Sequence, residues 1–326
     1  MYRADRFSKI NNSGHTPFIV TSVALSIVFL VGACMSRGEK KKVDTTVSTT
    51  EPAVVTPQAS TGDVDSVRKE TTIVTFASAQ SAYRQGKFGE AEQSFGAYVE
   101  RHPKNPYGLY MLGLSAWKQG NLDRAKEALE QSLVLDSTNV KTLLNLGRVL
   151  LEQGHADSAL VRIETAVALD SGSAEVYRMR GRVQNALGQR DSAEASYREA
   201  LSIDQNDSWS MNNLGLLLID EGRYEEALMP LARAMELRPE APSFANNLGV
   251  ALERTGHPGS AAQAYQSALS ADSTYTKAQT SLQRVYGMQD EMPIDVTQLA
   301  AQFKDSLDKA SQVRLSVKTA VVKPQP

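Results

Sequence analysis

The chain has 326 residues, of which 41% are hydrophobic, 22% charged and 6% aromatic, and its formal net charge is -2. This balance excludes a strongly basic surface of the kind that attracts nucleic acid, so we expect no nucleic-acid partner. The composition is otherwise that of an ordinary soluble protein, and the few aromatic residues favour helices over strands.

The first 33 residues have the layout of an export signal. Three basic residues come first: Arg3, Arg6 and Lys9. They precede a mainly apolar run without charged residues over residues 18–31, which is shorter than the roughly 20 residues that a helix needs to cross a bilayer. Gly32, Ala33 and then Cys34, the only cysteine of the chain, follow the run. This arrangement resembles the bacterial lipoprotein signal. The resemblance implies cleavage before Cys34, attachment of lipid to its sulfur, and a membrane anchor.

The orientation of this anchor has two interpretations. Arg37 and the lysines at 40–42 follow the apolar run, and under the positive-inside rule they favour an uncleaved anchor with the rest of the chain in the cytoplasm. The lipoprotein interpretation instead places the chain in the cell envelope, facing the periplasm. There, Met35 is not the acidic residue associated with retention at the inner membrane, which favours the outer membrane.

Residues 34–71 are predicted to be a disordered tether, because they are rich in Thr, Ser, Val and Pro and lack aromatic residues and any helical or strand period. From residue 72 the sequence repeats with a period of 34, without insertion or deletion. Six copies are found, at 72–105, 106–139, 140–173, 174–207, 208–241 and 242–275.

Four positions of the repeat carry the pattern. The eighth is small: Ala79, Gly113, Gly147, Gly181, Gly215 and Gly249. The fifteenth is always glycine: Gly86, Gly120, Gly154, Gly188, Gly222 and Gly256. The twentieth is always alanine: Ala91, Ala125, Ala159, Ala193, Ala227 and Ala261. The twenty-fourth is bulky: Phe95, Leu129, Ile163, Tyr197, Leu231 and Tyr265. This pattern predicts two helices of about 14 residues, separated by a glycine cap and packed small against large.

These positions resemble the tetratricopeptide repeat pattern over about 204 of the 326 residues. The resemblance implies an all-α, right-handed superhelical solenoid of six helical hairpins. Residues 276–289 are similar to another first helix and are expected to cap the solenoid. Residues 290–326 are expected to form an amphipathic helix, which either extends the cap or docks on a partner, followed by a disordered tail over the last eleven residues.

Two departures from the pattern lead to local expectations. The proline that ends the repeat in its relatives is replaced in three copies by Ser137, Ser171 and Ser273, which are expected to cap the next helix. In the fourth repeat Arg180 and Gln184 replace apolar residues, so we expect this hairpin to be the least tightly packed.

Nothing in the sequence predicts catalysis. We find no nucleophile elbow, phosphate-binding glycine loop or paired-cysteine motif, and too few residues flank the repeats for a catalytic domain. His155 and His257 occupy the same turn three repeats apart, so they cannot share a metal ion. We therefore expect a non-enzymatic protein without catalytic residues, metal, cofactor or small-molecule substrate.

The concave face that first helices line in relatives is the predicted binding surface. It would be formed by repeat positions two, five, six, nine, twelve and thirteen. Aromatic candidates are Tyr107, Tyr110, Trp117 and Trp209; basic candidates are Lys141, Arg148, Arg178 and Arg182; amide candidates are Asn145, Asn213 and Asn247. Aromatic and arginine side chains dominate binding energy at interfaces, and an amide can grip a peptide backbone through its donor and its acceptor. In the alternative interpretation, the aromatic residues fill gaps between helices and the charges are simply solvated.

Together these features predict a membrane-anchored scaffold that binds a peptide or helical segment of a partner protein, with acidic character, in envelope complex assembly. Two alternatives remain. One is a cytoplasmic adaptor held by the uncleaved anchor, and the other is an accessory subunit of an envelope enzyme.

Overall fold

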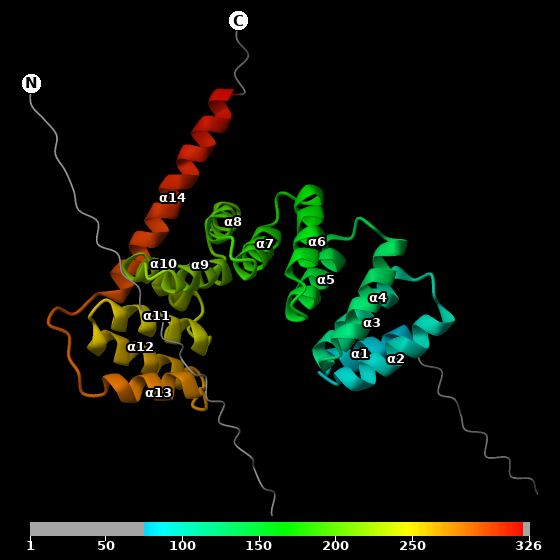
Figure 1. Ribbon diagram of the computed structural model, residues 1–326, viewed down its shortest axis with the longest axis horizontal. Helices are drawn as coiled ribbons and strands as arrows, with labels where there is room; N and C mark the ends of the chain where they lie inside the picture. The colour runs from blue at the N-terminus through cyan, green and yellow to red at the C-terminus, as the bar shows by residue number, and fades with distance from the viewer. Residues whose placement is uncertain (1–74, 322–326) are drawn as a thin grey trace, which may run out of the picture. The chain divides into compact units, whose positions relative to one another are not determined.

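The computed structural model describes residues 75–321, and every regular element in this part of the chain is an α-helix (Figure 1). The predicted signal, Cys34 and tether lie outside the described residues. No described helix is both long enough and apolar enough to cross a membrane.

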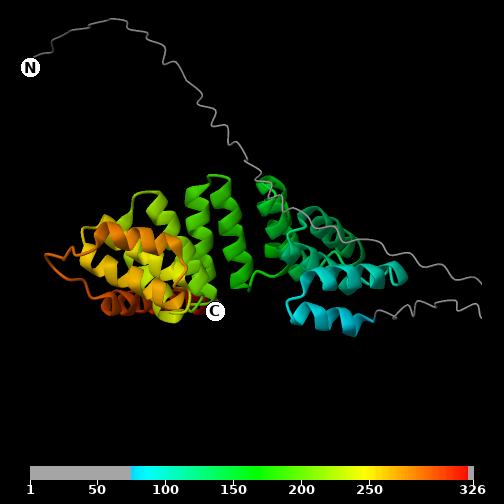
Figure 2. The ribbon, with the colours of Figure 1, turned by 90° about the horizontal axis from the view of Figure 1, so that it is seen from below.

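Helices α1 to α12 form consecutive hairpins, as the all-α solenoid predicts. The first helices of the hairpins are α1 (Phe76–Arg84), α3 (Pro106–Gln119), α5 (Val140–Glu152), α7 (Ala174–Ala186), α9 (Ser208–Asp220) and α11 (Pro242–Arg254). The second helices are α2 (Phe88–Arg101), α4 (Leu122–Leu135), α6 (Ala156–Leu169), α8 (Arg190–Ile203), α10 (Tyr224–Leu237) and α12 (Pro258–Ala271). Each helix packs on its neighbours in the chain, so the hairpins follow one another in sequence order (Figure 2). The predicted fold class is confirmed.

The contact inside each hairpin is the one that the repeat pattern predicts. All six alanines at the twentieth position are fully buried, and the bulky side chains at the twenty-fourth are at most 2% exposed. The glycine at the eighth position makes room for that bulky side chain. At Gly181, for example, an added Cβ would lie only 2.6 Å from the ring of Tyr197.

The first helices of the repeats end at a glycine and begin at a capping side chain. All six glycines at the fifteenth position have positive φ, as at Gly120 (φ 88°), which closes the first helix in the left-handed conformation that glycine tolerates best. At the start of the next first helix, the side chains of Asn105, Asn139 and Asp207 each accept a backbone N–H three residues on. The expected caps Ser137, Ser171 and Ser273 are wrong, because the capping residue comes two positions later in the repeat.

The fourth hairpin has a polar seam. Arg180 Nε donates a hydrogen bond of 2.9 Å to Ser196 Oγ, and this hydroxyl donates one of 2.6 Å to Gln184 Oε1. Buried apolar residues of α7 belong to one core cluster and those of α8 to the next. The substitutions at Arg180 and Gln184 therefore replace apolar packing with hydrogen bonds between α7 and α8.

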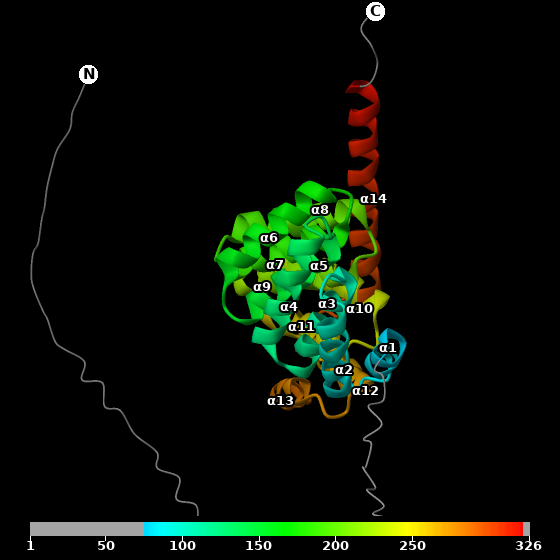
Figure 3. The ribbon, with the colours of Figure 1, turned by 90° about the vertical axis from the view of Figure 1, so that its right-hand side faces the viewer.

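Two helices follow the hairpins. α13 (Thr276–Val285) packs on α12 and α11, which suits the predicted cap. α14 (Val296–Val321) does not extend this cap; it packs along α10 and also contacts α8 (Figures 1 and 3). The expected tail over the last eleven residues is wrong in part, because α14 continues to Val321.

Replacing Gly181 by Ala should destabilise the protein, although alanine is the better helix former. Overpacking against Tyr197 costs about 1 to 3 kcal/mol, whereas alanine gains roughly 1 kcal/mol over glycine in a helix. Gly89→Ala is the matched control, because its Cβ would meet its nearest neighbour at an ordinary 3.5 Å. Urea unfolding should show a loss of stability for Gly181→Ala and none for Gly89→Ala; equal stability of the two variants would contradict the packing.

Candidate functional site

A series of polar contacts links the first helices of successive repeats. It starts at Tyr110 on α3, whose hydroxyl oxygen accepts a 3.2 Å hydrogen bond from Asn145 Nδ2 on α5. Asn145 is 7% exposed, and its amide also donates to the carbonyl of Lys141 and accepts from Arg148 Nη1 at 2.8 Å. Burial raises the pKa of the Tyr110 phenol, so this hydroxyl stays protonated. Tyr110, one of the predicted aromatic residues, and Asn145, one of the predicted amide residues, are thus hydrogen-bonded to each other.

The series of polar contacts continues through charged residues on α7. Arg148 forms an ion pair with Glu175, and Glu175 lies 3.8 Å from Arg178. Arg178 in turn pairs at 2.6 Å with Asp207, the buried residue that caps α9. Polar contacts therefore run without a break from α3 to the start of α9. This contact series holds the first helices of repeats two to five in register.

The basic surface expected from the sequence is smaller in the structure. Arg148 and Arg178 are largely neutralised by carboxylates of this chain, since both pair with Glu175 and Arg178 also pairs with Asp207. Lys141 and Arg182 are exposed, and neither pairs with a carboxylate of the described residues. Arg182 Nη1 donates to the Met179 sulfur, at 3.8 Å. Among the four predicted basic residues, Lys141 and Arg182 therefore keep their positive charge available to a ligand.

The aromatic candidates form two groups. Tyr107 is 50% exposed and stacks on Tyr110 with 5.9 Å between ring centroids. Trp117, on the same helix, is half-buried; its Nε1 donates a 2.8 Å hydrogen bond to Glu152 on α5, and Lys118 Nζ lies 4.5 Å from its ring centroid. All three rings belong to one helix, α3.

Trp209 on α9 forms the second aromatic group. It is 44% exposed, packs edge-on against Phe244 of α11 with ring centroids 5.0 Å apart, and lies 5.6 Å from the Arg238 guanidinium. One edge of the indole is thus fixed by the next repeat while nearly half of its surface faces solvent. A rigid, half-exposed aromatic ring is a suitable anchor for a ligand.

The amide candidates differ in how many of their hydrogen-bonding groups are already occupied within the protein. Asn145 is fully engaged within the chain, whereas Asn247 donates one hydrogen bond, of 2.8 Å, to Asn212 Oδ1 and accepts one of 3.5 Å from Asn246 Nδ2. Asn213 is half-buried, and no hydrogen bond of its side chain is found within the described part of the chain. The three amides therefore do not form one uniform row of free donors and acceptors.

Four residues of this surface were missed by sequence reasoning. Glu152, Glu175 and Asn212 stand at repeat positions thirteen, two and five, which the position rule already assigns to the inner face. The predicted residues were limited to basic and aromatic types and to amides at the sixth repeat position, which left these three out. Asp207 precedes its first helix, and the signal that could have identified it is its place as the helix cap.

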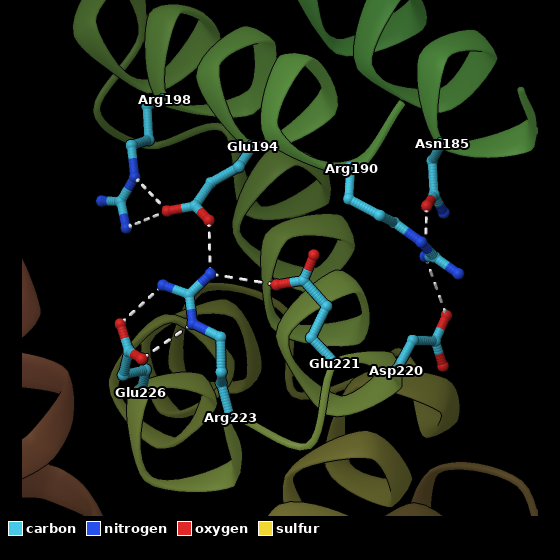
Figure 4. Close-up of polar contacts among 8 residues, drawn as sticks. All are labelled: Asn185, Arg190, Glu194, Arg198, Asp220, Glu221, Arg223 and Glu226. Carbon is cyan, nitrogen blue, oxygen red and sulfur yellow. Dashed lines mark hydrogen bonds and ion pairs between the residues drawn. The ribbon is translucent and has the colours of Figure 1, made fainter. Parts of the chain in front are cut away.

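A second polar cluster lies at the loop side of repeats four and five (Figure 4). Arg223 donates hydrogen bonds to Glu194, Glu221 and Glu226 at 2.6, 3.0 and 2.7 Å, and Glu194 also accepts from Arg198. Beside it, Arg190 contacts Asn185 and pairs with Asp220 at 3.6 Å. These contacts join α8 to the turn between α9 and α10, and they contain none of the predicted binding residues.

Three family models described as tetratricopeptide repeat match the chain, at residues 76–140 and 212–276, at 116–183 and at 169–240. Together they extend over more than half of the chain. The chain belongs to the tetratricopeptide repeat family. Proteins of this family are generally non-catalytic scaffolds for contacts between proteins, and all three matching models describe such repeats.

The chain is similar to several solved structures, and two of them, with TM-scores above 0.5, share its fold. A tetratricopeptide repeat protein from Parabacteroides merdae is 15% identical, with a TM-score of 0.55 over 64% of this chain and 82% of that one. The Cut9–Hcn1 hetero-tetramer of APC/C is 18% identical, with a TM-score of 0.56 over 64% and 42%. A thermophilic tetratricopeptide repeat protein from Thermus thermophilus is 24% identical, with a TM-score of 0.47 over 54% and 95%. No curated protein sequence matches the chain.

Removing Arg223 should change how stability depends on pH. Its hydrogen bonds lower the pKa of Glu226, and with those of Arg198 they lower the pKa of Glu194 despite the opposite effect of burial. A carboxylate with a lowered pKa stabilises the fold above its usual pKa, and this contribution disappears as pH falls through the folded-state value. Arg223→Met should therefore lower the melting temperature at about pH 7 and differ little from wild type at about pH 3.

Lys104→Met, at an exposed loop residue, is the control for loss of one positive charge. A difference between Arg223→Met and wild type that stays constant from neutral to acid pH would contradict the assignment. The same result would show that Arg223 stabilises the fold through packing alone.

Proposed function

We propose that this tetratricopeptide repeat protein is a membrane-anchored scaffold that captures a peptide segment of a partner on its first helices. The observation that carries the proposal is the combination of Trp209, half-exposed and fixed at one edge, with Arg182 and Lys141, exposed and without a carboxylate partner in the described chain. Exposed aromatic rings and cations on the first helices of successive repeats offer apolar anchors and charge for one extended ligand.

The charges of this surface set the expected character of the ligand. Glu175 and Asp207 already neutralise Arg148 and Arg178, so a uniformly acidic peptide would meet both signs of charge. A segment with one or two acidic residues beside an apolar residue fits better. Its carboxylates would pair with Arg182 and Lys141, and its apolar side chain would pack on an exposed ring of Tyr107 or Trp209.

The anchor is proposed from the N-terminal sequence. The apolar run over residues 18–31, the small residues before Cys34 and the absence of any other cysteine support a lipidated Cys34. The scaffold would then work in the cell envelope, facing the periplasm, in the assembly of an envelope complex. Met35 favours the outer membrane.

A second candidate topology rests on a specific observation, the four basic residues at Arg37 and 40–42. Their charge favours an uncleaved anchor with the repeats in the cytoplasm, where the same surface would serve an adaptor. In either location this protein would also suit the role of a binding subunit, joined to an enzyme that carries its own catalytic residues.

Charge reversal at the two unpaired cations tests the binding surface. Lys141→Glu combined with Arg182→Glu should weaken binding to an array of immobilised acidic–apolar peptides by about tenfold or more, since charge-assisted hydrogen bonds are lost. Lys104→Glu with Lys304→Glu changes the net charge equally at exposed residues of a loop and of α14, which packs on second helices. Equal loss of binding in both double variants would contradict a specific site and indicate non-specific charge attraction.

The intact mass of protein purified from its native membrane tests the anchor. Wild type should have the mass of the chain from Cys34 onward plus acyl groups, and Cys34→Ser should lose these groups because a hydroxyl does not replace the thiolate as nucleophile. A full-length mass without lipid in both proteins would sink the lipoprotein proposal and favour the uncleaved anchor.

A further inference from the structure

Helix α14 shows what the second helices of this solenoid can bind. It packs on α10 and also contacts α8 (Figures 1 and 3). Its Ala300 and Phe303 are 1% and 6% exposed and belong to the same apolar core as Leu231 of α10. Gln205 Nε2 at the end of α8 donates a 3.1 Å hydrogen bond to the Leu307 carbonyl. An amphipathic helix therefore fills the groove between α8 and α10.

The equivalent groove two repeats earlier, between α4 and α6, is open. Its residues precede those of the α8/α10 groove by 68 positions in the sequence. Two adjoining hollows of about 370 and 410 Å³ run along it, and Glu130 and Arg162 line both of them. Leu143 and Leu150 of α5 also contribute to the lining. Within the described part of the chain, α4 packs only on α3 and α5, and α6 only on α5 and α7, so no helix covers this groove.

Both walls of the α4/α6 groove carry an exposed valine. Val134 of α4 is 85% exposed, and Val161 of α6 is 62% exposed. Met229, the equivalent of Val161 in the covered groove, packs against the core that contains Phe303. Single exposed apolar residues are common on protein surfaces, but these two face one groove whose equivalent holds a helix.

The two valines are not a general feature of the repeat. The other grooves between successive second helices carry polar or small side chains on at least one wall at the same two positions: Glu100 and Glu127, Ala168 and Ala195, Ser202 and Met229, and Glu236 and Gln263. The α4/α6 groove is therefore the only one of the five with a branched apolar side chain on each wall.

The charges that line the α4/α6 groove favour an acidic occupant. Lys126 and Arg162 line it, and neither forms an ion pair within the described residues. Glu130 is the only carboxylate of the lining. In the covered groove, Glu194 and Arg198 replace Lys126 and Glu130, and these two neutralise each other at 2.7 Å. The open groove thus keeps an excess of positive charge with which carboxylates of a ligand can pair.

We propose that the α4/α6 groove binds an acidic amphipathic helix of another protein. The apolar stripe of this helix packs on the two valines, and carboxylates beside the stripe pair with Lys126 and Arg162. About four helical turns fit a groove as long as α4, roughly 20 Å at 1.5 Å per residue. Helix α14 of a second copy suits the groove less, because it carries four basic residues against two acidic ones and its Ala300 and Phe303 are already buried. The contact lies on second helices and is independent of the peptide surface proposed for the first helices.

Binding of a synthetic helical peptide to the full chain tests the proposal. The probe has the sequence of residues 295–310, the part of the chain that fills the α8/α10 groove, with Lys304→Glu and Lys309→Glu to make it acidic. It carries a fluorophore and a cross-link on its polar face, because isolated helices this short are marginal in water. The reference peptide has the unchanged sequence and the same cross-link. Fluorescence anisotropy should show about fivefold or tighter binding of the acidic peptide, since only this peptide places extra carboxylates beside the cations of the groove.

Lysine substitutions at the valines separate apolar burial from charge attraction. Val134→Lys with Val161→Lys adds positive charge, so charge attraction alone would strengthen binding of the acidic peptide, whereas lost apolar burial predicts about tenfold weaker binding. The matched control, Ala168→Lys with Ala195→Lys, adds the same charge at the equivalent exposed positions of the next groove and should bind no more weakly than wild type. All four side chains are exposed, so the melting temperatures should stay unchanged.

A third variant separates this groove from the first helices. Lys141→Glu with Arg182→Glu should bind the acidic peptide within about twofold of wild type at physiological salt, because both residues lie on first helices and exposed charges are screened over such separations. No binding of the acidic peptide, equal affinity of the two peptides, an equal effect of the two double lysine variants, or loss of binding in this third variant would each overturn the proposal. A dimer of the full chain in sedimentation that Val134→Lys with Val161→Lys abolishes would overturn it as well, because a second copy would then cover the groove.

Discussion

The whole architecture depends on one contact, between the bulky side chain at the twenty-fourth repeat position and the backbone of the first helix at the eighth. Where that position is glycine, an added Cβ would lie within 2.6 Å of the partner side chain, as it would at Gly113, Gly147 and Gly181. Helix backbones can approach this closely only without a side chain at the eighth position. Fully buried alanines at the twentieth position let the pair close further. Because the contact recurs every 34 residues, each hairpin stacks on the next in the same way.

This constraint leaves the remaining faces of the helices free to differ between repeats. On the first helices the difference is polar: Tyr110, Asn145, Arg148, Glu175 and Arg178 form one contact series that crosses three helices. Such a series fixes side-chain positions before any ligand arrives, which lowers the entropy cost of binding. On the second helices the difference is apolar, since α14 covers α10 while Val134 of α4 and Val161 of α6 are exposed. The same fold thus offers two surfaces of different chemistry.

The sequence predicted the fold well because the repeat contact is local. Small and bulky residues at fixed spacing identify the hairpin, and the glycines with positive φ identify its turn. The site was predicted less well, because its charges depend on contacts between repeats. Arg148 and Arg178 are basic in the sequence, but the stacking of α5, α7 and α9 brings Glu175 and Asp207 against them. The sequence did not predict where α14 packs. Its amphipathic pattern predicts a buried face but not which of several similar grooves buries it.

Hydrogen exchange is the most direct test of the central claim that the first helices bind a peptide. Exchange would be followed by mass spectrometry on the full chain, with and without the tightest-binding acidic–apolar peptide from the array. Binding to the first helices predicts slower exchange at the ends of α5, α7 and α9 that face the ligand, and no change in α6 or α8. Protection confined to the second helices, or protection equal in both sets of helices, would contradict the claim.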